Sequence, residues 1–224
     1  MKKINLEEIK KLFQANSNDE NAYNMSKYMK NKFAYYGIKK PLSNELIKPY
    51  MSNLKNYSEK EVYKIVKELW EEDEREMQYL ALTIINYYFK KTPMDIKFLE
   101  KLIVKKSWWD TVDNLSNHTG LYFKHNFDKE IIDRWVESDN IWLNRSAILF
   151  QLKYKNLMNE QLLSEIILRL VHKKEFFIQK AIGWVLREYT RTNPEFVLEF
   201  VEKHKIVGLA KREALRLILK NKLN

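Results

Sequence analysis

Pairs of amphipathic helices recur along this chain at a nearly constant interval, and this repeat constrains the fold more than any other feature. From residue 60 onward, each unit is a helix, a short polar link and a second helix, with apolar residues at helical spacing. Reference residues at the ends of the first helices are 33, 32, 35 and 31 residues apart, and they are Trp70, Ile103, Trp135, Leu170 and Val201. A single pair cannot bury its apolar faces alone, so successive pairs stack. The pattern predicts an all-α fold, specifically a curved α-solenoid.

The repeat also predicts how the chain is organised. The expected helix pairs are 61–70 with 74–89, 95–105 with 108–117, 130–136 with 141–154, 161–171 with 176–189, and 195–204 with 209–219. The preceding segment fits the repeat less well, although 27–33 looks helical and 37–41 is typical of a helix stop and turn. We therefore expect one domain over 1–224, with an N-terminal helical cap over 1–58 and five helix-pair repeats over 59–224.

Composition narrows the classes of function. The chain has no cysteine, and its four histidines lack the spacing of metal ligands, so we expect no metal or cofactor. We also expect a cytoplasmic protein without a membrane partner, because no apolar run is long enough to span a bilayer. The net charge of +10, from 40 basic and 30 acidic residues, favours a polyanionic partner. The alternative is a lysine-rich surface that is simply solvated.

The repeat register aligns charged residues on the second helices. Ten residues after the five reference positions lie Leu80, Asp113, Arg145, Lys180 and Lys211. Equivalent positions of stacked repeats follow one surface, and second helices commonly line the concave face of a solenoid. The sequence therefore predicts a concave basic groove that contains one acid. Because a lone carboxylate opposes polyanion binding, we expect Asp113 to serve catalysis.

Asp113 lies in the tryptophan-rich segment 107–113. On a helix, Trp108 would share the apolar face with Val112, whereas Trp109 lies one turn before Asp113 on a neighbouring face. A carboxylate beside an aromatic face suits a cation, or a sugar that becomes one. We therefore predict that Asp113 and Trp109 are catalytic and that Trp108 belongs to the core. The alternative is that Asp113 is an ordinary solvated helix acid.

A second aromatic residue lies between two bases on another expected helix. At helical spacing, Lys180, Trp184 and Arg187 share a face, and such a stripe is typical of a nucleic-acid surface. The adjacent Gly183 lowers helix propensity by about 1 kcal/mol, which suggests that another group approaches closely there. The alternative is that Trp184 packs under lysine side chains.

Further basic residues extend this prediction. Arg145 stands among apolar neighbours, so it is either ion-paired, with Asp110, Asp113 or Asp139, or faces a groove where its guanidinium suits a phosphate oxygen. Basic clusters at both ends would follow a phosphate backbone. They are Lys27, Lys30, Lys32, Lys39 and Lys40 near the start, and Lys205, Lys211, Arg212, Arg216, Lys220 and Lys222 near the end. Three other tryptophans have no acid partner and are expected to be structural, namely Trp70, Trp135 and Trp142.

The most distinctive stretches are 28–31, 68–76, 106–113, 138–145 and 175–189. They resemble the AlkD family, the DNA alkylation repair glycosylases built of HEAT-like repeats, and the resemblance covers nearly the whole chain. That family hydrolyses the N-glycosidic bond of N3- and N7-alkylated purines in duplex DNA, with the lesion kept stacked. The resemblance implies site roles for Asp113, Trp109, Trp184 and Arg145. It also implies a DNA-facing position for Tyr28, and Lys39 stands where the family has a glutamine.

Chemistry read from the residues agrees with that resemblance. A purine alkylated at N3 or N7 is cationic and departs as a neutral base, so the reaction needs no general acid. A carboxylate about 4 Å from the oxocarbenium-like sugar, at an effective dielectric near 20, is worth roughly 4 kcal/mol. An indole face adds about 0.5 to 2 kcal/mol. Without a lysine singled out in an apolar setting, we expect no lyase step.

The sequence thus predicts a monofunctional alkylpurine DNA glycosylase of base excision repair, monomeric and free of cofactor and metal. Its expected partner is double-stranded DNA that contains alkylated purines. The expected DNA contacts are Arg145, Tyr28, Lys180, Arg187, Lys39, Lys211 and Arg212. Two alternatives from other classes are a non-catalytic DNA-binding solenoid and a protein-binding scaffold.

Overall fold

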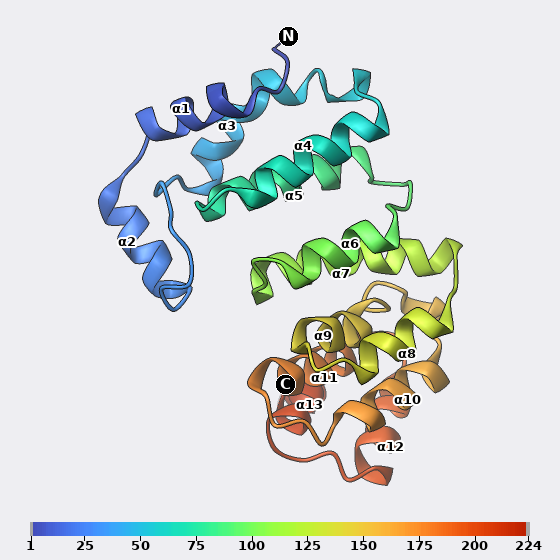
Figure 1. The fold of residues 1–224 in the computed structure, drawn as a ribbon. Coiled ribbons are helices and arrows are strands. Elements are labelled where there is room, and N and C mark those ends of the chain that lie inside the picture. The colour runs from blue at the N-terminus through green and yellow to red at the C-terminus, as the bar shows by residue number, and fades with distance from the viewer. Residues whose placement is uncertain (1, 223–224) are drawn as a thin grey trace. The chain divides into compact units, whose positions relative to one another are not determined.

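The computed structural model describes residues 2–222, and their regular secondary structure is helical (Figure 1). Thirteen α-helices and two short 3-10 helices occur in these residues, and strand-like pairing there is confined to one isolated bridge between Ala34 and Glu74. The prediction of an all-α fold is confirmed.

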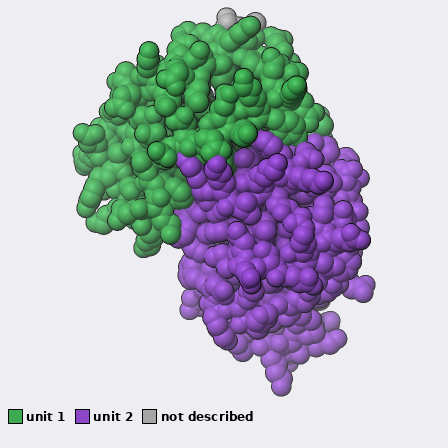
Figure 2. All heavy atoms as spheres, viewed as in Figure 1, with its two compact units in different colours: residues 1–92 green, residues 93–224 purple. Residues whose placement is uncertain are grey.

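The chain divides into two compact units, residues 1–92 and 93–224 (Figure 2). The first contains α1 (Leu6–Ala15), α2 (Asp19–Tyr28), α3 (Lys40–Met51), η1 (Leu54–Asn56), α4 (Glu59–Glu71) and α5 (Arg75–Tyr88). The second begins with α6 (Ile96–Val104), α7 (Trp109–His125), α8 (Lys129–Glu137), α9 (Ile141–Leu149) and η2 (Lys155–Leu157). It continues with α10 (Glu160–Leu170), α11 (Phe176–Tyr189), α12 (Pro194–Lys203) and α13 (Gly208–Lys222). The expected grouping into one domain with a cap over 1–58 stays a prediction.

The five expected helix pairs are present as α4 with α5, α6 with α7, α8 with α9, α10 with α11, and α12 with α13. Two helix ends differ from the expectation by more than three residues. Helix α7 continues to His125 instead of stopping near residue 117, and α9 ends at Leu149 because residues 150–153 form a turn. The 33-residue repeat therefore predicts helix order well and helix ends less well.

The N-terminal region corrects one expectation. The helix there is α2, which ends at Tyr28, so 27–33 is not a helix. Lys30 and Asn31 have φ angles of 59° and 55°, in the left-handed region that terminates helices. Gly37 has φ 84° and a Cβ there would meet the Asn18 carbonyl oxygen at 2.0 Å, so glycine is required in this turn. Pro41, in contrast, lies in the first turn of α3, where proline starts a helix.

Within the second unit, the first helices of the pairs lie together, and so do the second helices. The second helices α7, α9, α11 and α13 pack against one another in sequence. Figure 1 shows α8, α10 and α12 on one side of this unit and α9, α11 and α13 on the other. The apolar stripes face inward as expected, for example Val112 and Leu115 on α7 and Ile182 on α11. Among the three tryptophans expected to be structural, Trp135 is fully buried in this unit, and Trp70 is buried in the first unit.

In three of the five pairs, a side-chain amide on the second helix binds the end of the first helix. The Gln78 amide donates to the carbonyl oxygen of Glu72 at 2.7 Å, the Asn144 amide to that of Ser138 at 2.9 Å, and the Gln179 amide to that of Lys173 at 2.7 Å. Each amide also reaches a carbonyl at or just after the end of the first helix, such as that of Trp135 at 2.8 Å. These carbonyls lack intrahelical partners, so in each of these three pairs one amide satisfies them. These amide contacts were not predicted from the sequence.

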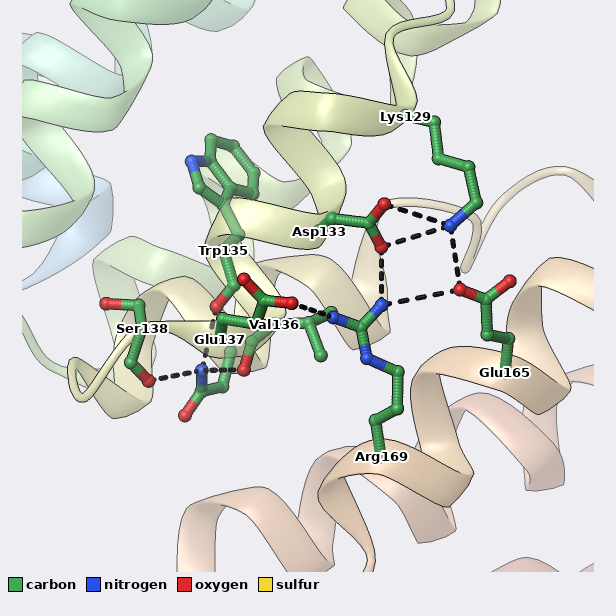
Figure 3. Close-up of polar contacts among 9 residues, drawn as sticks. Lys129, Asp133, Trp135, Val136, Glu137, Ser138, Glu165 and Arg169 are labelled. Atoms are coloured by element: carbon green, nitrogen blue, oxygen red, sulfur yellow. Dashed lines mark hydrogen bonds and ion pairs between the residues drawn. The ribbon is translucent and has the colours of Figure 1, made fainter.

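Ion pairs join the first helices of successive pairs, α6, α8 and α10, to one another. Arg134 of α8 makes two bonds to Glu100 of α6, at 2.6 and 2.7 Å. Arg169 of α10 binds Asp133 of α8, and Lys129 bonds to Asp133 at 3.0 Å, as Figure 3 shows. The same network takes in Glu137, which accepts a bond of 2.9 Å from Arg169, and Glu165. Because carboxylates hold these three bases, they are poor candidates for binding a polyanion.

Candidate active site on the second helices

The tryptophan-rich segment lies at the start of α7, with a different boundary from the expected one. Trp108 is extended, with φ −159° and ψ 164°, and its carbonyl accepts the Val112 N–H at 3.1 Å as the helix begins. Trp109 is the first helical residue, and Asp113 follows one turn later. Trp108 therefore precedes the helix instead of lying within it, although its half-buried ring still packs inside the second unit.

Asp113 and Arg145 form a two-pronged ion pair between α7 and α9. The Arg145 Nε atom donates to Asp113 Oδ1 at 2.7 Å, and its Nη2 atom donates to Oδ2 at 2.8 Å. The side chain of Arg145 is 5% exposed, and that of Asp113 is 18% exposed. Of the two interpretations of Arg145, the ion pair with Asp113 is confirmed. The contact also confirms that their repeat positions are neighbours in space.

The other side of the Arg145 guanidinium contacts α11. Its Nη1 atom donates to the Phe177 carbonyl oxygen at 2.5 Å, and its central carbon lies 5.9 Å from the Phe177 ring. The Phe177 ring packs against Trp108 at 4.9 Å and Trp142 at 5.1 Å between ring centroids. Aromatic packing therefore positions the carbonyl that positions Arg145. Trp142 belongs to this support, as its structural assignment predicted.

The pKa of the Asp113 carboxyl is raised above its ordinary value. Burial is the largest cause, because low dielectric disfavours the charged form. The hydrogen bonds and positive charge of Arg145 act in the opposite direction, and nearby Asp110 raises the pKa further. The site therefore holds a desolvated carboxylate whose charge depends on its arginine.

Trp184 lies on α11 beside a close helix crossing. A Cβ on Gly183 would lie 2.4 Å from the Glu213 Cβ and 2.9 Å from the Ala210 carbonyl oxygen, so the close approach inferred from this glycine is that of α13. Glu213 forms ion pairs with both flanking bases, with Lys180 at 3.0 Å and with Arg187. The base, aromatic, base stripe is thus present, but its two bases share one buried acid.

Glu213 is a site residue that the sequence analysis missed. The residue is 8% exposed, and burial acts to raise the pKa of its carboxyl, but the bonds and charges of Lys180 and Arg187 together outweigh burial and lower this pKa. Gly183 was the available signal, because it indicated that another helix approaches this part of α11. The sequence did not show which residue that helix brings.

The remaining expected contacts lie on exposed surface. Lys211 and Arg212 are exposed on α13, in the second unit. In the first unit, Tyr28 and Lys39 are exposed and border the same pocket. The structure therefore brings Asp113 and Arg145 into contact, and separately brings Tyr28 and Lys39 together.

Within residues 2–222, no group of three or more His, Cys, Asp or Glu side chains is arranged to hold a metal ion. In the same range no helix has both the length and the apolarity needed to cross a membrane.

Residues 9–218 match the family model described as DNA alkylation repair enzyme. The chain belongs to this family. A solved structure described as a predicted DNA alkylation repair enzyme from Enterococcus faecalis is 30% identical, with a TM-score of 0.80, over 89% of this chain and 95% of that chain. No curated protein matches. As a member of the DNA alkylation repair enzyme family, the protein has a role in DNA repair, with DNA as its substrate.

Proposed function

We propose that this family member is a monofunctional DNA glycosylase that hydrolyses the N-glycosidic bond of cationic N3- or N7-alkylated purines in duplex DNA. The observation that carries the proposal is the Asp113 carboxylate, which is largely buried and held by two bonds from Arg145, one turn after Trp109. A carboxylate fixed in this way suits the stabilisation of a developing positive charge.

In the proposed reaction, the bond between the sugar C1′ and the purine nitrogen breaks, and both electrons leave with the base. The alkylated base carries a positive charge beforehand, so it departs neutral and needs no proton. Asp113 stabilises the oxocarbenium-like sugar, and Trp109 and Trp184 offer aromatic faces to the same cation. Water then adds to C1′ and gives up one proton to the solvent. Each Asp113 oxygen accepts one bond from Arg145 and keeps a lone pair with which it can orient that water.

Arg145 fixes the position of the Asp113 carboxylate, but its positive charge weakens the stabilisation that Asp113 gives to the sugar cation. A carboxylate about 4 Å from the sugar is worth roughly 4 kcal/mol at an effective dielectric near 20, and a cation about twice as far away offsets roughly half of that. The net effect of Asp113 is then between about 2 and 4 kcal/mol. This range corresponds to about thirtyfold to a thousandfold in rate.

We propose that Arg145 acts first by positioning Asp113, since three of its nitrogen atoms donate to protein acceptors. Contact of Arg145 with a phosphate stays a prediction. Exposed Lys211 and Arg212 are proposed to contact the DNA backbone, whereas Lys180 and Arg187 are proposed to do so as a unit with Glu213. In the first unit, Tyr28 and Lys39 are the proposed contacts.

The test is release of N3-methyladenine and N7-methylguanine from methylated duplex DNA by wild type and Asp113→Asn. We expect release by wild type and a loss of about thirtyfold to a thousandfold in the variant. Glu100→Gln is the matched control, because Glu100 also holds an arginine by two bonds, but on the first-helix face. Full activity of Asp113→Asn would remove Asp113 from its proposed role. If wild type binds DNA in a salt-sensitive way but releases neither base, the protein is a non-catalytic DNA-binding protein and not a glycosylase.

A further inference from the structure

The first unit contains a pocket of about 340 Å³ that no step of the proposed reaction uses. Its lining includes Asn21, Asn24, Tyr28, Tyr35, Lys39 and Tyr79. These side chains come from α2, from the segment between α2 and α3, and from α5. The volume lies near the lower end of the range typical of small-molecule sites, about 300 to 1,000 Å³.

One wall of the pocket is fixed by a buried carboxylate. Glu76 of α5 accepts three backbone N–H groups, from Tyr36 at 3.2 Å, Gly37 at 2.9 Å and Ile38 at 3.1 Å. Tyr35 and Lys39, which line the pocket, stand immediately before and after these three residues. The backbone of residues 36–38 is therefore held to α5 by three bonds to the Glu76 carboxyl group.

Further contacts hold the same segment against α5. The Arg75 N–H donates to the Ala34 carbonyl at 2.9 Å, and the Arg75 guanidinium lies 3.9 Å above the Phe33 ring. The hydroxyl groups of Tyr35 and Tyr79 are 3.3 Å apart. The pocket is thus prepared before a ligand arrives, which lowers the entropy that binding must offset.

The chemistry of the lining favours a flat ligand with polar edges. Three tyrosines offer aromatic faces, Met25 and Met29 add apolar surface, and two asparagines offer amide donors and acceptors. Lys39 adds one positive charge, and the described residues that line the pocket include no Asp or Glu. Stacking on aromatic rings together with bonds to a base edge is how proteins recognise unpaired bases. We propose that this pocket binds a single unpaired nucleobase, with the phosphate of its nucleotide at Lys39.

The base can come from DNA or from a free nucleotide, and both offer the same groups. The family assigns DNA to this protein, and 69% exposed Tyr28 gives the pocket an aromatic edge open to solvent. The proposal needs a nucleotide as ligand but no bond cleavage, so it does not rest on the glycosylase activity. The two can therefore fail separately.

The test compares the full chain on an undamaged duplex with one unpaired adenine bulge and on the fully paired duplex, and also measures its binding to dAMP. We expect wild type to bind the bulged duplex on the order of tenfold more tightly. Tyr79→Leu removes one aromatic wall and should abolish this preference while it leaves affinity for the paired duplex unchanged. Tyr87→Leu is the matched control, because Tyr87 lies on the same helix, is 52% exposed and does not line the pocket.

A second variant keeps the test valid if the Tyr79→Leu protein does not fold. Asn24 is exposed, so Asn24→Asp should fold normally, yet it places a negative charge in the pocket and should also abolish the preference. Saturable dAMP binding that both variants weaken, without a preference for the bulge, would assign the pocket to a free nucleotide. Equal affinity for both duplexes together with no dAMP binding would overturn the proposal, as would a preference that survives both variants. Base release from methylated DNA, measured separately, reports on the glycosylase activity alone.

Discussion

Gly183 of α11 and Glu213 of α13 bring these two helices as close as their backbones permit. A Cβ on Gly183 would lie 2.4 Å from the Glu213 Cβ, a distance that side chains do not tolerate. The same Glu213 carboxylate binds Lys180 and Arg187, which stand before and after Gly183 on α11. One glycine therefore sets both the packing of the last two second helices and the charge around Trp184.

Gly183→Ala should destabilise the protein even though alanine is the better helix former. The substitution gains up to about 1 kcal/mol of helix propensity, but the new methyl group forces α13 away, at a cost of about 1 to 3 kcal/mol. We expect a lower midpoint of thermal unfolding and of urea unfolding. Asn117→Ala, at an exposed position within α7, should not destabilise. A Gly183→Ala protein as stable as wild type would contradict the close crossing.

Glu213→Gln should strengthen binding to undamaged duplex DNA. Removing this charge leaves Lys180 and Arg187 without their shared carboxylate partner, so more positive charge meets the phosphates. We expect affinity to rise about twofold to tenfold at low salt, with a steeper dependence on salt concentration. Glu202→Gln, an exposed acid on α12, changes the net charge equally and should have a smaller effect. Equal effects of the two variants would show that Glu213 does not restrain these bases.

The rate of base release should fall at low pH with a midpoint above the usual pKa of aspartate, about 3.9. Burial raises the pKa of Asp113, and the carboxylate is active only when charged, so activity is lost as pH falls through that raised value. Because the pKa of Asp113 is higher in the folded protein than in the unfolded chain, the unfolded chain loses this proton first. The free energy of unfolding therefore falls as pH rises from the unfolded pKa to the folded one. Single-turnover rates as a function of pH measure the midpoint.

Arg145→Lys should move that midpoint to higher pH, because it weakens the bonds that favour the charged carboxylate. We expect the rate at neutral pH to fall between about tenfold and a hundredfold through loss of position. A slower enzyme with an unchanged pH midpoint would contradict the electrostatic role of Arg145 while leaving a packing role.

His118 should make the protein less stable in mild acid. Burial lowers the pKa of this histidine from 6.5 to about 4, so the unfolded chain takes up a proton before the folded one does. Its contribution to stability is complete above pH 6.5 and disappears as pH falls toward 4, with a difference of about 3 kcal/mol. Urea unfolding at pH 7 and pH 4.5 should show this loss in wild type and a smaller one in His118→Gln. His125→Gln, an exposed histidine on α7, should behave as wild type.

Sequence periodicity predicted the helix order because each pair must bury a stripe of apolar residues, and these residues therefore recur at regular spacing in the sequence. It predicted helix ends poorly, since they depend on local contacts such as the bonds that Gln78, Asn144 and Gln179 make to helix termini. The helix expected over 27–33 failed for a similar reason. Left-handed backbone at Lys30 has no sequence signal, and at Asn31 the signal is weaker than a glycine would give.

By itself, the sequence determined the all-helical repeat, the family, and the alignment of Asp113 with Arg145 one repeat later. It left open whether Arg145 pairs with an acid or faces a phosphate, and it gave no role to Glu213. Tertiary structure showed the ion pair of Arg145 with Asp113 and that of Glu213 with Lys180 and Arg187. An ion pair depends on how far apart two helices lie and on which way their side chains point. Helix periodicity fixes the face on which a residue stands, whereas the packing of α7, α9, α11 and α13 fixes which charges meet.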